Sequence, residues 1–211
     1  MIDNRVRKIV TAGVFSALVI VLGITNLGFI PLPGASLTIF HVPVIIAAIL
    51  EGPVVGLFVG LLFGVFSLVQ AAMAAVSLVD LAFLQYPWIA IVPRILIGPV
   101  AWLVYSLISG AFFGKAKNNG GISPIQETRV LRETPGIFFG AALGSLVNTA
   151  LVLSGFAALL PDFTLPMALA VAAINGPLEA GFAIGISLAV ILPWKGISRQ
   201  GRSKLNKNGQ Q

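Results

Sequence analysis

Four polar residues inside long apolar stretches are the strongest candidates for chemistry in this sequence. They are Arg94, Asn148, Asn175 and Glu179. A polar side chain at membrane depth is costly, so it faces a cavity or a polar partner and marks a candidate functional site. An arginine can hold a carboxylate through two parallel hydrogen bonds. The amide side chains both donate and accept, which suits hydroxyl and amide groups.

The same residues fit a second interpretation, in which Arg94 and Glu179 form an internal ion pair that only joins two helices. Counted along the helices predicted below, they lie at different distances from the outer ends, and at 1.5 Å per residue their depths differ by about 13 Å. Direct pairing therefore requires a tilt or a kink. The sequence leaves both interpretations open, a ligand cavity and a structural network.

Other candidate residues lack partners in the sequence. His41 is the only histidine and cysteine is absent, so a metal site has no second imidazole or thiolate ligand, and we expect a satisfied histidine at the membrane interface. The segment Tyr86-Pro87-Trp88 is either an interfacial aromatic belt or a lid over a substrate. Neither a Gly-x-Ser-x-Gly elbow nor a Gly-rich phosphate loop is present. These features favour binding and transport over catalysis and predict neither a metal nor a cofactor.

The composition indicates whether the helices that carry these residues face water or lipid. Hydrophobic residues make up 57% of the 211-residue chain and charged residues 9%, against about 25% charged in ordinary soluble domains. A chain with so little polar surface must face lipid. Its length allows roughly six membrane crossings of about 20 residues each.

The basic residues predict the orientation. Apart from Arg94, the lysines and arginines lie in three clusters at residues 5–8, 115–132 and 195–207. An even number of crossings between the clusters puts all three on one side, which the positive-inside rule identifies as the cytoplasm. We therefore predict an all-α integral membrane protein with six transmembrane helices and both termini cytoplasmic.

The predicted elements follow from the apolar runs and the breaks between them. Helices are expected at residues 9–25, 39–50, 54–73, 89–113 and 135–160, and a sixth runs from the turn at 161–164 to residue 192. Loops are expected at 26–34, in a tight turn at 51–53, in a partly helical outer segment at 74–88 and in a polar cytoplasmic segment at 115–134. Residues 1–194 form one membrane domain, and the basic tail 195–211 is predicted to be disordered.

Glycines recur every four residues on three of these helices. The sets are Gly56, Gly60 and Gly64; Gly136, Gly140 and Gly144; and Gly181 and Gly185. Such faces let helix backbones approach closely in a membrane. They predict either compact packing within one subunit or a surface on which a partner subunit slides.

Three stretches resemble the substrate-binding S components of energy-coupling factor (ECF) vitamin transporters, in the branch that includes pantothenate and folate carriers. They are HVPVIIAAILEGPVVG at 41–56, PRILIGPVAWLVY at 93–105 and GAALGSLVNTALVL at 140–153. The resemblance extends over residues 8–194. It implies a six-helix subunit that captures a vitamin on the outer side, docks on a membrane T component bearing two ATPase subunits, and topples to release its cargo inside.

The resemblance also implies roles for individual residues. In this family the pocket is built from outer loops and the outer halves of helices 4 to 6. That implies substrate contacts for Arg94, Asn148, Asn175 and Glu179, with Trp88 and Asn26 as lid contacts. Docking uses an Ala-x-x-x-Ala pattern on the first helix, for which this chain offers Ala12 and Ser16, or Gly13 and Ala17, each departing by one residue.

We therefore predict a high-affinity vitamin-binding subunit of an ATP-driven importer in a prokaryotic cell membrane, with pantothenate as the favoured substrate. Folate or another water-soluble vitamin is the alternative substrate. Two other functions stay open. A standalone transporter driven by an ion gradient would use Glu179 or Asp80 as proton carrier, and an intramembrane enzyme would need Glu179 and His41 as acid and base.

Overall fold

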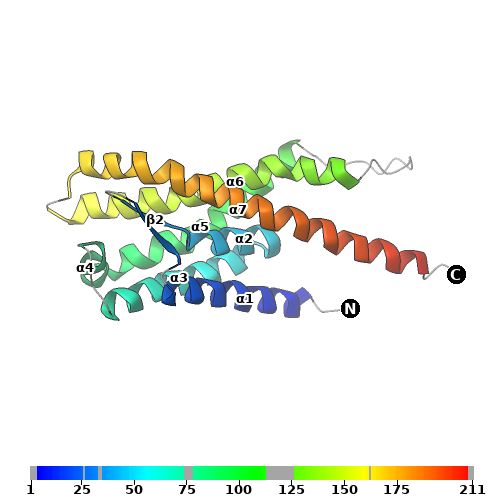
Figure 1. Ribbon diagram of the computed structural model, residues 1–211, viewed down its shortest axis with the longest axis horizontal. Coiled ribbons are helices and arrows are strands. Elements are labelled where there is room, and N and C mark those ends of the chain that lie inside the picture. Colours follow the sequence, from blue (N-terminus) through cyan, green and yellow to red (C-terminus); the bar gives the residue numbers. More distant parts are fainter. Residues whose placement is uncertain are drawn as a thin grey trace.

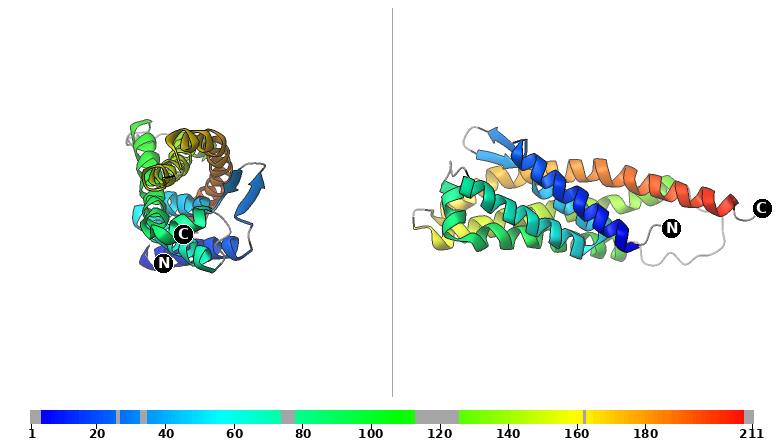
Figure 2. Two further views of the ribbon diagram at one scale, coloured as in Figure 1. Left: turned by 90° about the vertical axis from the view of Figure 1, so that its left-hand side faces the viewer. Right: turned by 90° about the horizontal axis from the view of Figure 1, so that it is seen from below.

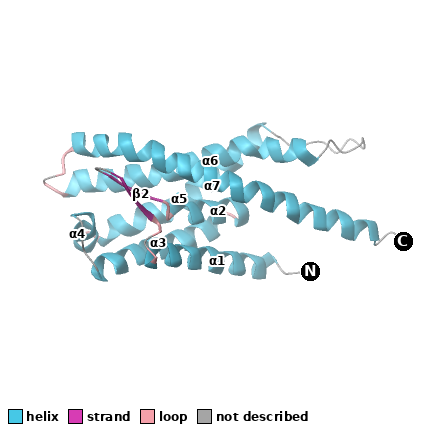
Figure 3. Cartoon of the chain, in the orientation of Figure 1, coloured by secondary structure: helices cyan, strands magenta, loops and turns pink. Residues whose placement is uncertain are grey.

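The fold is a bundle of long helices with one small β-hairpin. The computed structural model describes residues 4–25, 27–32, 35–73, 78–112, 126–161 and 163–208. The elements run in the order α1 (Asn4–Ile24), β1 (Phe29–Leu32), β2 (Ala35–Thr38), α2 (His41–Glu51), α3 (Pro53–Met73), α4 (Leu78–Gln85), α5 (Pro87–Phe112), α6 (Gln126–Leu159) and α7 (Leu165–Asn208). Figure 3 shows how fully helices dominate the molecule.

Five of the helices contain a segment long and apolar enough to cross a membrane. These segments are Arg5–Ile24, Pro53–Met73, Pro87–Gly110, Glu133–Leu159 and Leu165–Lys195. Helix α2 has 11 residues, which at 1.5 Å per residue is about 16 Å, roughly half of a bilayer core. It is nevertheless the centre of the core, because nearly all of its residues are buried.

The two ends of the bundle differ in what they carry. The N- and C-termini lie at one end, and α4 and the turn between α6 and α7 lie at the other (Figure 1). The hairpin lies on the flank of the bundle beside α7, in the half away from the termini (Figure 2). This arrangement leaves the start of α2, which follows the hairpin directly, in that same half.

The hairpin is the main element that the sequence analysis predicted wrongly, as a loop. Strands β1 and β2 pair antiparallel, from Phe29 opposite Thr38 to Leu32 opposite Ala35. Four residues per strand give too short a pattern for alternation to be recognised.

Helix boundaries also differ from the predictions at three places. Helix α1 begins at Asn4 rather than residue 9, and α6 begins at Gln126, inside the predicted loop 115–134. Helix α7 continues to Asn208, so the tail predicted to be disordered is helical as far as that residue. In each case polar but helix-forming residues extend a helix that the apolar segment has already nucleated.

Other predicted elements are confirmed. The turn after α2 closes on Gly52, whose φ of +104° favours glycine and whose N–H donates to the Ala48 carbonyl at 2.9 Å. The segment 74–88 is predicted to be partly helical, and the structure contains the helix α4 within it.

The glycine ladders of α3 and α6 pack these helices against successive segments of α5, residues 90–98 and 101–109. A Cβ on Gly60 would collide with the carbonyl oxygen of Arg94, and one on Gly98 would lie 2.7 Å from Cα of Gly56. A Cβ on Gly140 would lie 2.8 Å from the Ala101 carbonyl oxygen. Compact packing is therefore the role of these two ladders.

The glycines of α7 differ from those of the other ladders. An added Cβ on Gly181 or Gly185 meets nothing within 4 Å. Both glycines line an open apolar groove on the outside of α7.

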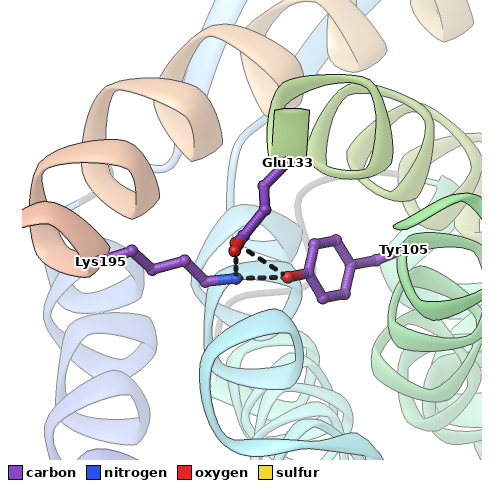
Figure 4. Close-up of polar contacts among 3 residues, drawn as sticks. All are labelled: Tyr105, Glu133 and Lys195. Carbon is purple, nitrogen blue, oxygen red and sulfur yellow. Dashed lines mark hydrogen bonds and ion pairs between the residues drawn. The ribbon is translucent and has the colours of Figure 1, made fainter. Parts of the chain in front are cut away.

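Polar contacts tie the helices together near the termini. The ammonium group of Lys195 (α7) donates to Glu133 (α6) at 2.6 Å and to the hydroxyl of Tyr105 (α5), as Figure 4 shows. The Tyr105 hydroxyl also donates to Glu133 at 3.1 Å. On the other side of the bundle, Arg7 of α1 bonds the buried carboxylate of Glu51 at 3.0 Å. The first set of contacts joins α5, α6 and α7, and the second joins α1 and α2.

Candidate functional site

Arg94 is a buried cation surrounded by aromatic rings. Its residue exposure is 7%, and its guanidinium carbon lies 4.7 Å from the ring centroid of Phe83 (α4) and 5.5 Å from that of Phe63 (α3). One terminal nitrogen, Nη1, donates to the Ile89 carbonyl at 2.9 Å. The buried Nε has no hydrogen-bond partner among the described residues. Cation–π contacts offset part of the desolvation cost but supply no negative charge.

The carboxylate of Glu179 joins three elements. Its Oε1 accepts hydrogen bonds from the backbone N–H of Thr38 at 3.1 Å and from the Thr38 hydroxyl at 2.8 Å. Its Oε2 accepts from the Thr149 hydroxyl at 2.8 Å. Glu179 on α7 therefore fixes the end of β2 to α6, and its own residue exposure is only 5%.

The internal ion pair between Arg94 and Glu179 that the sequence left open does not form. No nitrogen–oxygen distance between these two described side chains falls within 4.0 Å, and Arg94 bonds a backbone carbonyl instead. The carboxylate still acts electrostatically on the guanidinium. The pair is thus close enough to interact, without contact.

The two asparagines differ in their surroundings. Asn148 on α6 is 7% exposed, and its buried Oδ1 has no hydrogen-bond partner in the part of the chain that the structure describes. Asn175 lies one turn before Glu179 on α7 and is half-buried. Helices α6 and α7 therefore each contribute one amide side chain to this half of the bundle.

His41 departs from the expectation of a satisfied interfacial histidine. It is 1% exposed at the first position of α2. Within the described chain neither of its ring nitrogens has a hydrogen-bond partner. It also interacts electrostatically with Glu179.

The structure describes one of the two predicted lid residues. Trp88 lies in the first turn of α5 and is 52% exposed, so its ring is not buried with Arg94. Asn26 lies outside the described residues.

Two residues of the cluster were missed by the sequence analysis. They are Thr38 and Thr149, both of which bond Glu179. Threonine is common in both strands and apolar helices, so its type alone carries little signal. The neighbouring Asn148 was the available clue for Thr149.

The predicted docking residues fall into two groups on α1. Ser16 is buried and Ala12 packs against the core, so this pair faces inward. Gly13 and Ala17 are exposed, and an added Cβ on Gly13 meets nothing within 4 Å. Only the second pair lies on the open face of α1.

The arrangement can bind an anion but offers no metal site. No group of three or more histidine, aspartate or glutamate side chains could hold a metal ion within the described ranges. The cluster combines one buried cation, one buried carboxylate and amide groups, drawn from α2, β2, α5, α6 and α7. These groups suit a small ligand that carries a carboxylate and several hydrogen-bonding groups.

A comparison with known families identifies the family of the chain. The family model described as "ECF transporter, substrate-specific component" matches residues 7–195, which include all the apolar helices. The chain belongs to this family. Its function is accordingly that of a transporter component and not of an enzyme, and it is a multi-pass protein of the bacterial plasma membrane.

A curated relative of this S component is known. It is "Pantothenate transporter PanT" of Leuconostoc mesenteroides subsp. mesenteroides, which is 34% identical over 173 residues. The alignment covers 78% of this chain and 76% of the relative. The resemblance recognised in the sequence is therefore confirmed at the level of the family.

Proposed function

We propose that this S component is the high-affinity pantothenate-binding subunit of an ATP-driven ECF importer. The observation that carries the proposal is the buried guanidinium of Arg94, which has no carboxylate within ion-pair distance in the described structure. A buried charge is stable only when it is paired and hydrogen-bonded. The carboxylate of pantothenate supplies the missing partner, and its binding would take up Nε as well.

The uncharged part of pantothenate contains an amide and two hydroxyl groups, and the remaining polar residues complement them. The amides of Asn148 and Asn175 donate and accept hydrogen bonds. Oε2 of Glu179 accepts one hydrogen bond, from Thr149, and an ionised carboxylate oxygen has room for a second. Glu179 thus serves the ligand with Oε2 while Oε1 holds the hairpin.

The membrane topology belongs to the same proposal. Six passes result when the hairpin and α2 together complete the crossing that α2 is too short to make alone. Both termini are then cytoplasmic, in agreement with the three basic clusters. The cluster around Arg94 and Glu179 opens toward the outer side, where a vitamin is captured.

The partners follow from the family. The S component docks on a transmembrane T component that carries two ATPase subunits, and the exposed small residues Gly13 and Ala17 of α1 form its closest contact. Small residues let helix backbones approach each other in lipid.

Calorimetric titration of the detergent-purified chain with a panel of water-soluble vitamins tests the proposal. We expect saturable binding that is tightest for pantothenate. Tighter binding of folate or another vitamin would change the substrate and keep the transport role. Absence of saturable binding to every vitamin would overturn the binding function, and uptake by cells that lack the ATPase subunits would favour a standalone ion-coupled transporter.

A further inference from the structure

His41 is the most deeply buried polar ring in the described structure without a hydrogen bond. It is 1% exposed, and neither Nδ1 nor Nε2 has a partner among the described residues. Burying a polar group without a hydrogen bond costs free energy, and native proteins rarely leave one so. The ring lies in an apolar part of α2, where Phe40 and Val42 are also buried.

The packing of α2 on α6 places His41 level with Asn148. Ile45 of α2 lies 3.2 Å from the position of a Cβ added to Gly144 of α6. The two helices run in opposite directions here, because Thr38, just before α2, is joined through Glu179 to Thr149, which follows Gly144. His41 lies one turn before Ile45 on α2, and Asn148 lies one turn after Gly144 on α6. The two residues therefore lie at the same level.

Arg94 lies further toward the end of the bundle that carries α4. Its guanidinium bonds the carbonyl of Ile89, and Ile89 packs at Gly155, about two turns beyond Asn148 on α6. Aromatic contacts connect the two positions. Phe40, next to His41, stacks on Phe63 with the ring centroids 5.6 Å apart. Phe63 in turn lies 5.5 Å from the guanidinium of Arg94. The carboxylate of Glu179 lies near the start of α2, because it accepts hydrogen bonds from Thr38, three residues before His41.

Three buried side chains in the half of the bundle away from the termini thus carry polar atoms without a partner in the described structure. They are both ring nitrogens of His41, Oδ1 of Asn148 and Nε of Arg94, on α2, α6 and α5. One unmet polar atom is explained by a single water molecule. Three of them, on three helices of the same half of the bundle, are the pattern of an elongated ligand site without its ligand.

We propose that His41 is a substrate-contacting, specificity-determining residue that binds the hydroxyl-bearing part of the ligand. The assignment rests on the proposed function. Arg94, about two turns further along the bundle, takes the carboxylate at the other end of the ligand. A neutral imidazole has one N–H donor and one acceptor nitrogen, which matches a hydroxyl group that accepts and donates. The negative charge of Glu179 beside His41 excludes the carboxylate from this side of the site.

The test is a titration of the wild-type chain and four variants with pantothenate and with pantothenol, in which an alcohol replaces the carboxyl group. His41→Phe keeps an aromatic ring and removes both nitrogens. We expect it to weaken binding of both ligands at least tenfold and by a similar factor. Arg94→Met is expected to weaken pantothenate binding far more than pantothenol binding, because only pantothenate carries the charge that Arg94 pairs with.

Two further measurements separate recognition from folding. His41→Gln restores a donor and an acceptor, and we expect it to recover part of the affinity that His41→Phe loses. The unliganded His41→Phe chain is expected to melt at or above the wild-type temperature, since the change removes two unpaired polar atoms from an apolar site. A residue with a merely structural role would instead lose stability and affinity together.

The matched control is Ser187→Ala. Ser187 on α7 is also fully buried, and its Oγ has no partner in the described structure, but it lies two turns beyond Glu179. We expect wild-type affinity from this variant. Unchanged pantothenate binding by His41→Phe overturns the assignment alone, as does a loss for pantothenate without a loss for pantothenol. A wild-type chain that binds no pantothenate overturns the proposed function and this assignment with it.

Discussion

Arg94 illustrates what a single residue contributes to a site inside a membrane. Its guanidinium is held by one backbone carbonyl and two aromatic rings, so it is positioned before any ligand arrives. Such contacts fix orientation without neutralising charge. An anionic ligand therefore gains a charge-assisted hydrogen bond at a cation that needs no rearrangement.

The first prediction concerns this cation. Arg94→Ala should weaken pantothenate binding by at least about 2 kcal/mol, roughly thirtyfold, through loss of a charged hydrogen bond. Arg94→Lys keeps the charge but loses the planar fork, so its affinity should lie between those of wild type and Arg94→Ala. Titration calorimetry measures both. Unchanged affinity in Arg94→Ala would remove this residue from the site.

The second prediction concerns the hydrogen bond between Thr149 and Glu179. Thr149→Val preserves shape and removes the hydroxyl that donates to Oε2. Hydrogen bonds between membrane helices contribute on average about 0.6 kcal/mol, so a destabilisation of about 1 kcal/mol is expected at this charged acceptor. A double-mutant cycle with Glu179→Gln, followed by thermal unfolding, measures the coupling. Strictly additive effects would show that the two side chains act independently.

Residue types predicted part of this site. Arg94, Asn148 and Glu179 attract attention because charge and amide groups are rare in apolar segments, and the structure buries all three. Thr38 was missed because its role depends on a strand that the sequence did not reveal. The prediction for His41 was wrong because the hydrogen-bond partners of a ring nitrogen come from residues distant in sequence.

At the scale of elements, α5 is the helix against which both α3 and α6 pack through glycines. The ladder of α3 contacts residues 90–98 and that of α6 residues 101–109, and the first of them reaches the backbone of Arg94 itself. Spacing of four residues predicted the existence of these faces but could not identify which helix each one meets. That choice depends on interhelical packing, which a single sequence does not show.

The third prediction tests this contact. Gly60→Ala places a methyl group against the Arg94 carbonyl, so α3 and α5 must separate, and overpacking of this kind costs about 1–3 kcal/mol of stability. Gly110→Ala is the control, because an added Cβ there meets nothing within 4 Å. Thermal unfolding should show a lower midpoint for the first variant only. Equal midpoints would mean that the ladder tolerates a wider spacing.

At the scale of the whole molecule, composition and charge predicted the class, and the structure adds the arrangement of the ends. Five long spans alone would put the termini on opposite sides of a membrane. Both ends of the chain nevertheless lie at the same end of the bundle (Figure 1). An even number of passes follows only if the hairpin and the short helix α2 together complete one.

The last prediction tests this topology, and the absence of cysteine makes the test clean because a single introduced thiol reports only on itself. Thr164 is exposed in the turn between α6 and α7, and Ser203 lies in the basic end of α7. In intact cells a membrane-impermeant maleimide should label the Thr164→Cys variant and not the Ser203→Cys variant. Inverted vesicles should give the reverse pattern. An Asn4→Cys variant, at the start of α1, should label from the same side as the Ser203→Cys variant. If these two variants label from opposite sides, the number of passes is odd, and α2 with its hairpin enters and leaves the membrane on one face.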